Sequence, residues 1–240
     1  SIADLAGAIE SCSLCGECEP VCPENIDQVE MVVDLRRQLP QQTLVGRIMG
    51  VARYPVESVA LSDTLMPRET AEGATLFRPT SYTSSRALLL PGKVLRAHPE
   101  TLARVLALLG NAGKINVGDD SGEDISLALE SGVEIPPQRL AQFLAPLRHL
   151  KILMVDDGLL LRYLRCWLPR TRIISLGEAL SGLAAVRRSL EATDLYVIEP
   201  RAYHADYQRL VKYYDGLHRA TGCTLNLDLQ RIAIPATVHS

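Results

Sequence analysis

Residues 86–118 read RALLLPGKVLRAHPETLARVLALLGNAGKINVG. The run opens with a short apolar segment that ends in Pro91-Gly92, and it closes with a second short apolar segment, KINVG, at 114–118. Between them, apolar residues of 99–113 recur at intervals of three and four, and a glycine ends the segment. This stretch therefore predicts a strand, a helix and a second strand.

The same alternation continues toward the C-terminus. Further strands are predicted at 151–157, 172–176 and 194–200, and the helices between or after them are EDISLALESG, PPQRLAQFLAPLRHL, LLLRYLRCWLP, 178–191 and 203–222. Strands that alternate with helices pair in parallel, and the helices cover both faces of the sheet. Residues 86–240 are therefore expected to form an α/β domain of two halves, 86–150 and 151–240.

The first 85 residues have a different character. Residues 1–40 contain a short helical pattern, a group of cysteines and a second helical pattern that stops before Pro40, which predicts a small helical unit. Across 41–85 the periodicity fades, and Pro, Thr and Ser recur, so we expect a connecting region with short helices around 41–53. The predicted fold class is α/β, a small helical ferredoxin-like unit followed by a parallel-sheet domain.

Composition narrows the possible functions. The chain has 240 residues, of which 47% are hydrophobic, and its formal net charge is -3, so bulk charge does not favour nucleic acid or anionic lipid. Arg, Pro or Gly interrupts every apolar run before the ~18 residues that a membrane-spanning helix needs. The N-terminal residues lack an initiator Met and the basic start of a signal peptide, so we expect processing or a missing upstream segment before Ser1.

Four of the six cysteines fall within SCSLCGECEPVCPEN, residues 11–25, as Cys-x2-Cys-x2-Cys-x3-Cys-Pro. This run is typical of bacterial ferredoxins, in which thiolates hold a [4Fe-4S] cluster. Its members, the predicted metal and cofactor ligands, are Cys12, Cys15, Cys18 and Cys22. The alternative is a structural zinc site, although such sites normally use two separated cysteine pairs. Clustering also disfavours a disulfide framework, and it indicates a reducing, cytoplasmic compartment, with any membrane association made through partners.

The spacing leaves the fourth ligand open. In two-cluster ferredoxins the fourth cysteine of this run ligates the other cluster. Cys12, Cys15 and Cys18 are therefore predicted to hold one cluster, whose fourth ligand is Cys22, a lone downstream cysteine, or a residue of a missing segment or neighbouring chain. If the fourth ligand is a residue other than Cys22, Cys22 would serve a second cluster.

The stretch CSLCGECEPVCPENIDQVEMVVDLRRQL, residues 12–39, resembles the second ferredoxin motif of heterodisulfide-reductase-like iron–sulfur proteins. These include the iron–sulfur subunits of glycolate, lactate and glycerol-3-phosphate oxidoreductases. The resemblance implies a following α/β region with Cys-Cys-Gly segments and a flavoprotein partner. Here Lys93, Asp120 and Ser121 stand where the family has cysteines, and 156–158 reads Asp-Asp-Gly, so the region resembles a degenerate copy without the catalytic cluster.

Other candidate sites have simpler interpretations. GDDSGED (118–124) has carboxylates for a cation but not the spacing of a calcium loop, and a solvated loop in which Asp120 or Ser121 caps the next helix is favoured. A packed face is favoured over a quinone or substrate cleft for the polar-tipped group Tyr203, His204, Tyr207, Tyr213, Tyr214 and His218. Cys166, beside Trp167, is predicted to be buried. The arginines after the cysteines, predicted to form a solvated face or a docking patch for an acidic partner, are Arg36, Arg37, Arg47 and Arg53.

The expected function is an electron-transfer subunit of a multi-subunit oxidoreductase, not catalytic alone. It would relay electrons between a flavin-containing dehydrogenase or flavoprotein and a further cluster or quinone. The alternative is a mainly structural assembly subunit whose cluster stabilises the fold. Autonomous thiol or disulfide chemistry is disfavoured because the cysteines it needs are absent from the α/β region. No glycine-rich nucleotide or flavin motif is present in the sequence.

Overall fold

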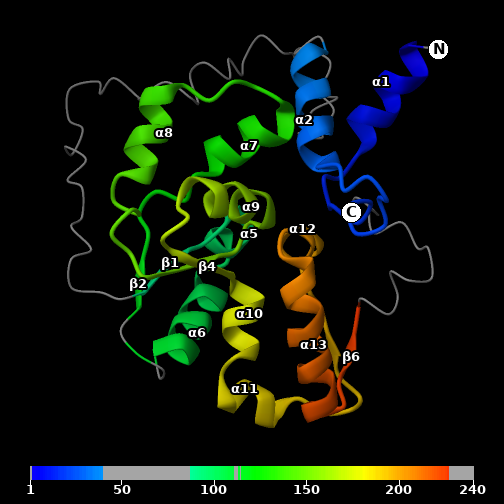
Figure 1. Ribbon diagram of the computed structural model, residues 1–240. Coiled ribbons are helices and arrows are strands. Elements are labelled where there is room, and N and C mark those ends of the chain that lie inside the picture. Colours follow the sequence, from blue (N-terminus) through cyan, green and yellow to red (C-terminus); the bar gives the residue numbers. More distant parts are fainter. Residues whose placement is uncertain (1, 40–86, 111–112, 114, 227–240) are drawn as a thin grey trace, which may run out of the picture.

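The structure, a computed structural model, describes residues 2–39, 87–110, 113 and 115–226 (Figure 1). The predicted connecting region 41–85, with its short helices around 41–53, lies outside these residues. None of the described helices is long and apolar enough to cross a membrane.

The predicted parallel sheet is confirmed. Strands β1 (Ala87–Leu90), β2 (Ile115–Val117), β3 (Ile152–Val155) and β4 (Arg172–Ser175) pair in parallel in the order β2-β1-β3-β4. The two central strands, β1 and β3, are nearly all apolar and buried, as expected for strands covered on both faces. Both predicted halves thus contribute strands to one sheet.

Helices cover the two faces of this sheet, and successive strand residues point to opposite faces. On one face Leu88, Leu90, Leu153 and Val155 pack with α7 (Glu123–Ser131), α8 (Pro137–Leu144) and α9 (Gly158–Trp167). On the other face Leu89 and Met154 pack with α5 (Lys93–Ala97), α6 (Pro99–Gly110) and α10 (Leu176–Ser181). Figure 1 shows α7, α8 and α9 on one side of the strands and α6 and α10 on the other.

Beyond β4 three sequence predictions need correction. The strand predicted at 194–200 is only β5 (Leu195–Tyr196), which pairs with β6 (Thr224–Leu225) in a separate two-stranded sheet. The helix predicted over 178–191 is divided into α10 and α11 (Ala184–Ser189), because Leu183 is extended. The helix predicted over 203–222 is likewise divided into α12 (Pro200–His204) and α13 (Tyr207–Thr221), because Asp206 leaves the helical conformation.

The N-terminal helices α1 (Ile2–Ser11) and α2 (Gln28–Gln38) pack against each other, and α2 also packs on α7. Val29 and Val33 on α2, with Leu14 from the intervening loop, belong to the same hydrophobic core as β1 and β3. The cysteine segment is therefore fastened to the α/β domain by a shared core.

Candidate iron–sulfur site

The four cysteines lie on the loop between α1 and α2, residues 12–27, which we call the cysteine loop. Its path requires left-handed backbone conformations at Leu14 (φ 57°), Gly16 (φ 78°) and Asn25 (φ 51°). A Cβ atom on Gly16 would lie 2.9 Å from Cβ of His204. Glycine is therefore required at residue 16 both by its conformation and by the close approach of α12.

The first three cysteines share an electrostatic environment. Partial burial is the main cause that raises the pKa of the Cys18 thiol, and the neighbouring Cys15, Glu19 and Cys12 raise it further. The backbone N–H of Leu14 donates to Sγ of Cys12 at 3.5 Å. The Cys18 thiol thus lies near two other cysteines and Glu19, whose negative charges disfavour its ionisation.

Cys22 has different neighbours. The pKa of its thiol is lowered, chiefly by the backbone N–H of Ile26 and then by the side chain of Gln28, with the N–H groups of Glu24 and Asn25 adding to the effect. These donors come from the turn that leads into α2. The thiolate of Cys22 is therefore stabilised by hydrogen bonds from its own side of the loop.

Across the part of the chain that the structure describes, no three or more His, Cys, Asp or Glu side chains are grouped so that they could hold one metal ion. Tetrahedral zinc at a Zn–S distance of about 2.3 Å would bring its sulfurs to within about 3.8 Å of each other. A cubane distributes its thiolates over several irons and so needs a wider set of ligands. The choice between these two kinds of centre therefore rests on the spacing of the cysteines in the sequence.

Arg36 on α2 anchors the start of the cysteine loop. Its side chain is almost fully buried, and the guanidinium donates to the carbonyl oxygens of Ile9 (3.0 Å), Glu10 (3.3 Å), Cys12 and, on α7, Glu130 (2.6 Å). The prediction that Arg36 belongs to a solvated face or docking patch is wrong. The last carbonyl oxygens of α1 have no hydrogen-bond donor within the helix, and the buried guanidinium of Arg36 provides the missing donors. Burial lowers its pKa from the ordinary value.

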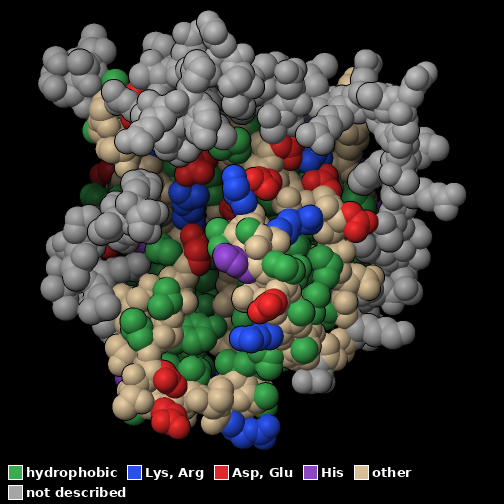
Figure 2. All heavy atoms as spheres, turned by 180° about the vertical axis from the view of Figure 1, so that it is seen from behind, with side chains coloured by type: hydrophobic (Ala, Val, Ile, Leu, Met, Phe, Trp, Pro, Cys, Tyr) green, Lys and Arg blue, Asp and Glu red, His purple; other side chains and the backbone are tan. Residues whose placement is uncertain are grey.

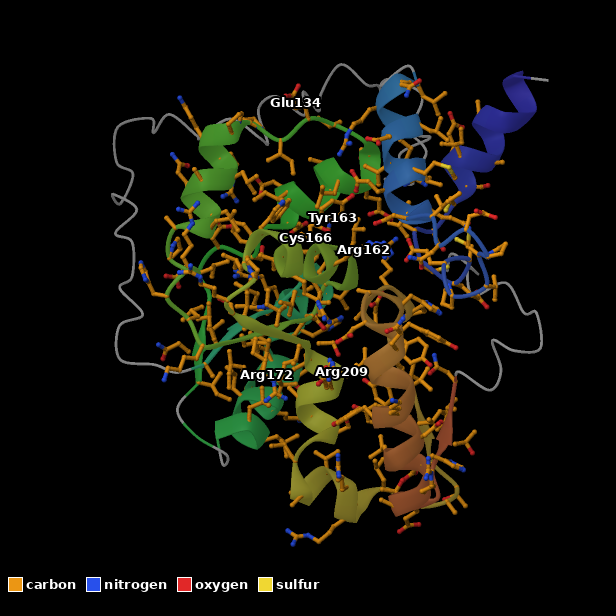
Figure 3. The ribbon with its side chains drawn as sticks, viewed as in Figure 1. Glu134, Arg162, Tyr163, Cys166, Arg172 and Arg209 are labelled. Atoms are coloured by element: carbon orange, nitrogen blue, oxygen red, sulfur yellow. The ribbon has the colours of Figure 1, made fainter. Side chains whose placement is uncertain are left out.

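Arg162 on α9 anchors the middle of the loop. It makes a two-pronged ion pair with Glu19, at 2.7 and 2.9 Å, and it also donates to Asp27 at 2.8 Å. Glu19 in turn accepts the N–H of Val29 at 3.1 Å, and Asp27 caps α2 by accepting the N–H of Glu30 at 2.9 Å. Figure 3 shows Arg162 extending from α9 toward the loop. One arginine thus binds two carboxylates beside the cysteines, and one negative charge remains unbalanced.

A third anchor comes from α12. Arg201 donates to the carbonyl of Ser13 at 2.9 Å and pairs with Glu130 at 2.8 Å. Nδ1 of His204 lies 2.9 Å from the carbonyl oxygen of Cys15 and 3.0 Å from that of Pro200. Because carbonyl oxygens only accept, Nδ1 carries the proton. Burial lowers the pKa of His204, which favours the neutral ring.

The packed-face interpretation of the Tyr and His residues is confirmed for Tyr203, His204 and Tyr214, which are buried. The contact of His204 with the loop was not foreseen, because these segments are nearly two hundred residues apart and no motif joins them. The prediction that Cys166 is buried is wrong: its side chain is exposed, since the inner face of α9 is formed by Leu159, Leu160, Leu161 and Leu164.

The positions that would carry the family's other cysteines lie after the strands, at the carboxyl edge of the sheet. Nζ of Lys93 pairs with Glu123 at 3.3 Å, and Arg139 holds both Asp120 and Asp124 at 2.7–2.9 Å. Oδ2 of Asp156 accepts the N–H of Gly92 at 3.2 Å. The polar side chains of Lys93, Asp120 and Asp156 are therefore bound by other groups of the same chain.

The predicted cap of the following helix is also wrong in detail. The N-cap of α7 is Gly122, in a left-handed conformation, and no side chain caps the helix there. Asp120 instead accepts the N–H of Gly122 at 3.0 Å while it binds Arg139. On the face seen in Figure 2, acidic and basic side chains are interspersed, in keeping with the absence of a strong bulk charge.

Comparison of the chain with protein-family models, with curated proteins and with solved structures found no match.

Proposed function

We propose that this chain is an iron–sulfur electron-transfer subunit of a multi-subunit oxidoreductase. In this role it relays electrons between a flavin-containing dehydrogenase or flavoprotein and a further cluster or quinone. Cys12, Cys15 and Cys18 would hold a [4Fe-4S] cluster, and Cys22 would be its fourth ligand or serve a second cluster. A flavoprotein partner is proposed because residues 12–39 resemble the second ferredoxin motif of heterodisulfide-reductase-like proteins.

One observation supports this proposal above the others: the Cys-x2-Cys-x2-Cys-x3-Cys-Pro run lies on a loop whose carbonyl groups are held by the buried Arg36 and the half-buried Arg201. Fixed ligands suit electron transfer, because a rigid site reorganises little when the charge of a cluster changes. When bound, the cluster would supply the one-electron chemistry. The residues of the chain would position it and set its environment.

The surface near the loop favours a protein partner. Val21, Ile26 and Met31 expose 79%, 49% and 45% of their surface, and all lie within ten residues of Cys22. Exposed apolar side chains next to a redox centre suit docking of another subunit. A cytoplasmic subunit attached to other subunits, with any membrane contact made by them, is the corresponding location.

The test begins with metal analysis. The full chain, purified or reconstituted without oxygen, is expected to contain iron and acid-labile sulfide, while about one zinc and no iron would overturn the cluster. Redox titration followed by paramagnetic resonance then asks whether electrons are transferred. A cluster that no flavoprotein or quinone couple reduces would contradict the relay.

A structural role is the second candidate, and the anchoring by Arg36, Arg162 and Arg201 favours it specifically. A loop fastened to α7, α9 and α12 would transmit the rigidity of a bound cluster to the domain. Thermal unfolding with and without the cluster measures this contribution. Strong stabilisation together with a redox-inert cluster would establish the structural role in place of the relay.

A further inference from the structure

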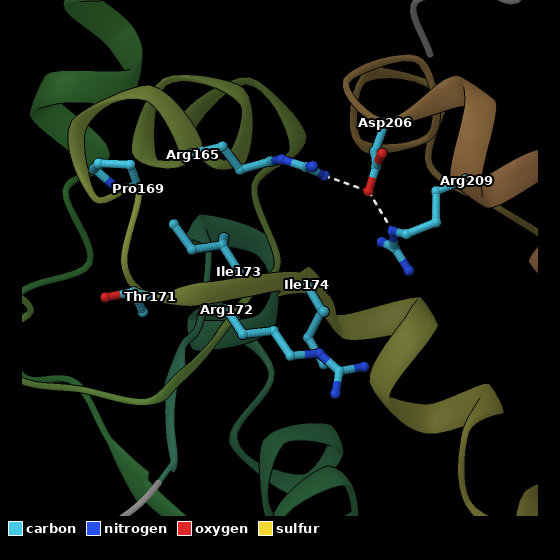
Figure 4. Close-up of a pocket in the computed structure, with 8 residues that line it drawn as sticks. All are labelled: Arg165, Pro169, Thr171, Arg172, Ile173, Ile174, Asp206 and Arg209. Carbon is cyan, nitrogen blue, oxygen red and sulfur yellow. Dashed lines mark hydrogen bonds and ion pairs between the residues drawn. The ribbon is translucent and has the colours of Figure 1, made fainter.

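A pocket of about 390 Å³ lies beside the edge strand β4, and its function is not explained by the cysteine loop (Figure 4). Its volume is within the range of roughly 300–1000 Å³ that is usual for small-molecule sites. The lining residues are Arg165, Pro169, Thr171, Arg172, Ile173, Ile174, Asp206 and Arg209. Arginines from α9, β4 and α13 thus line one pocket together with apolar residues.

The charges of this site do not cancel. Asp206 bridges Arg165, at 2.5 Å, and Arg209, and Arg209 also holds the buried Glu178 through two contacts at 2.6 and 2.8 Å. Arg172 is exposed, and within the described residues its guanidinium has no ion-pair partner. Three arginines against two carboxylates leave one positive charge.

The backbone of β4 adds a polar group. The N–H of Arg172 donates to the carbonyl oxygen of Lys151, which precedes β3. Along a strand, the backbone groups of successive residues point alternately to one neighbouring strand and to the other side. The N–H and C=O of Ile173 therefore point to the open edge of the sheet, the side on which the pocket lies. Pro169, Ile173 and Ile174 supply apolar surface next to them.

From this arrangement we infer that the pocket binds a singly charged organic anion, a carboxylate on a short apolar body. The headgroup lies against Arg172, whose guanidinium has no ion-pair partner among the described residues, because a planar guanidinium matches a carboxylate in a two-pronged contact. The apolar body lies on Pro169, Ile173 and Ile174. The single excess charge selects against a doubly charged phosphate ester. This site is independent of the proposed iron–sulfur function.

The pocket and the cysteine loop share one helix. Arg162, which holds Glu19, precedes Arg165 by three residues on α9, so the two side chains are about 4.5 Å apart along the helix axis. Figure 3 shows Arg172 and Arg209 farther from the cysteine loop than Arg162. A ligand in the pocket would thus contact the helix that anchors the cysteines.

The test is calorimetric titration of the full chain with hexanoate, hexyl phosphate and hexan-1-ol at low ionic strength. Hexanoate is expected to bind saturably at one site, and Arg172→Gln is expected to weaken its binding about tenfold or more. Arg188→Gln is the matched control, because Arg188 is an exposed arginine on α11 away from the pocket. It should change affinity less than about twofold.

Each contrary result overturns a different step. Absence of hexanoate binding, or equal losses in Arg172→Gln and Arg188→Gln, would refute the site. Equal binding of hexan-1-ol would refute the role of the arginines, and tighter binding of hexyl phosphate would refute the single charge. If an acidic peptide binds and hexanoate does not, the small-ligand proposal is wrong, and the edge of β4 instead binds a peptide as an added strand.

Discussion

Replacement of Arg36 by glutamine tests whether the buried arginine holds the cysteine loop to the domain. The guanidinium donates to four carbonyl oxygens, on Ile9, Glu10, Cys12 and Glu130. A glutamine has a shorter side chain and a single amide group, so at least two of these hydrogen bonds should be lost. Carbonyl oxygens left buried without a donor destabilise the folded state.

Hydrogen bonds to a charged donor contribute about 1.5–3 kcal/mol each, so two lost bonds correspond to about 3–6 kcal/mol. Removal of a buried charge offsets part of this loss, because the guanidinium no longer has to be desolvated. We therefore expect Arg36→Gln to lower the free energy of unfolding by about 3 kcal/mol, a large share of the ~5–15 kcal/mol typical of a folded domain.

The assay is urea unfolding of the metal-free full chain, followed by circular dichroism. The control is Arg37→Gln, since Arg37 is the next residue on α2 and its side chain pairs with Asp34 and Glu30 at the surface. Exposed pairs of this kind contribute about 0.2–1 kcal/mol. If Arg36→Gln lies within about 1 kcal/mol of Arg37→Gln, the anchoring argument is wrong.

Three further predictions follow from single positions. Gly16→Ala should destabilise the chain by about 1–3 kcal/mol in urea unfolding, because the residue has positive φ and its Cβ would meet His204. The control Gly7→Ala should be neutral or stabilising, because a Cβ at this position of α1 would have open space around it. Equal effects of the two substitutions would contradict this prediction. Asp156→Asn should raise stability at pH 7, because burial raises the pKa of Asp156 above 3.8 and the folded state loses stability as pH rises through that folded pKa. This gain should shrink toward acid pH and be absent in the exposed control Asp215→Asn, and a gain that does not depend on pH would count against burial as its cause. Iodoacetamide should label exposed Cys166 in the native chain and buried Cys223 only after unfolding, as read by mass spectrometry; rapid native labelling of Cys223 would be inconsistent with the structure.

Local pattern was enough to predict the main sheet. Strands β1 and β3 are short, almost wholly apolar segments bounded by Pro91-Gly92 and by Asp156-Asp157, and these features are typical of a strand covered on both faces. The segment 194–200 has similar composition but forms a two-residue strand outside the main sheet. Composition gives the tendency of a segment to be extended, whereas its partner depends on the packing of the whole chain.

The anchors of the cysteine loop could not be predicted for a related reason. Arg36 and Arg37 are adjacent and chemically identical, yet one is buried and the other is at the surface. The difference arises because Arg36 faces the ends of α1 and α7, and the Glu130 contact spans 94 residues of sequence. A charged residue is buried only where partners are supplied, and partners this distant leave no local pattern.

These distant contacts also determine which backbone groups face the cysteines. In a trans peptide the C=O and the N–H point in opposite directions. Because Arg201 takes the carbonyl of Ser13, the N–H of Leu14 in the same peptide is turned the other way, and it donates to Sγ of Cys12. His204 takes the carbonyl of Cys15 in the same manner, which turns the N–H of Gly16 away from α12.

Amide hydrogen bonds to sulfur are among the main factors that set the potential of an iron–sulfur cluster. In this chain their direction is imposed by side chains of α2 and α12 that pull the loop carbonyls outward. The α/β domain would then do more than support the cysteine loop: through Arg201 and His204, together with Arg36 of α2, it would fix the donors around the proposed cluster. In the proposed electron-transfer subunit the domain would have this role without any cysteine at positions 93, 120 and 121, which are Lys93, Asp120 and Ser121.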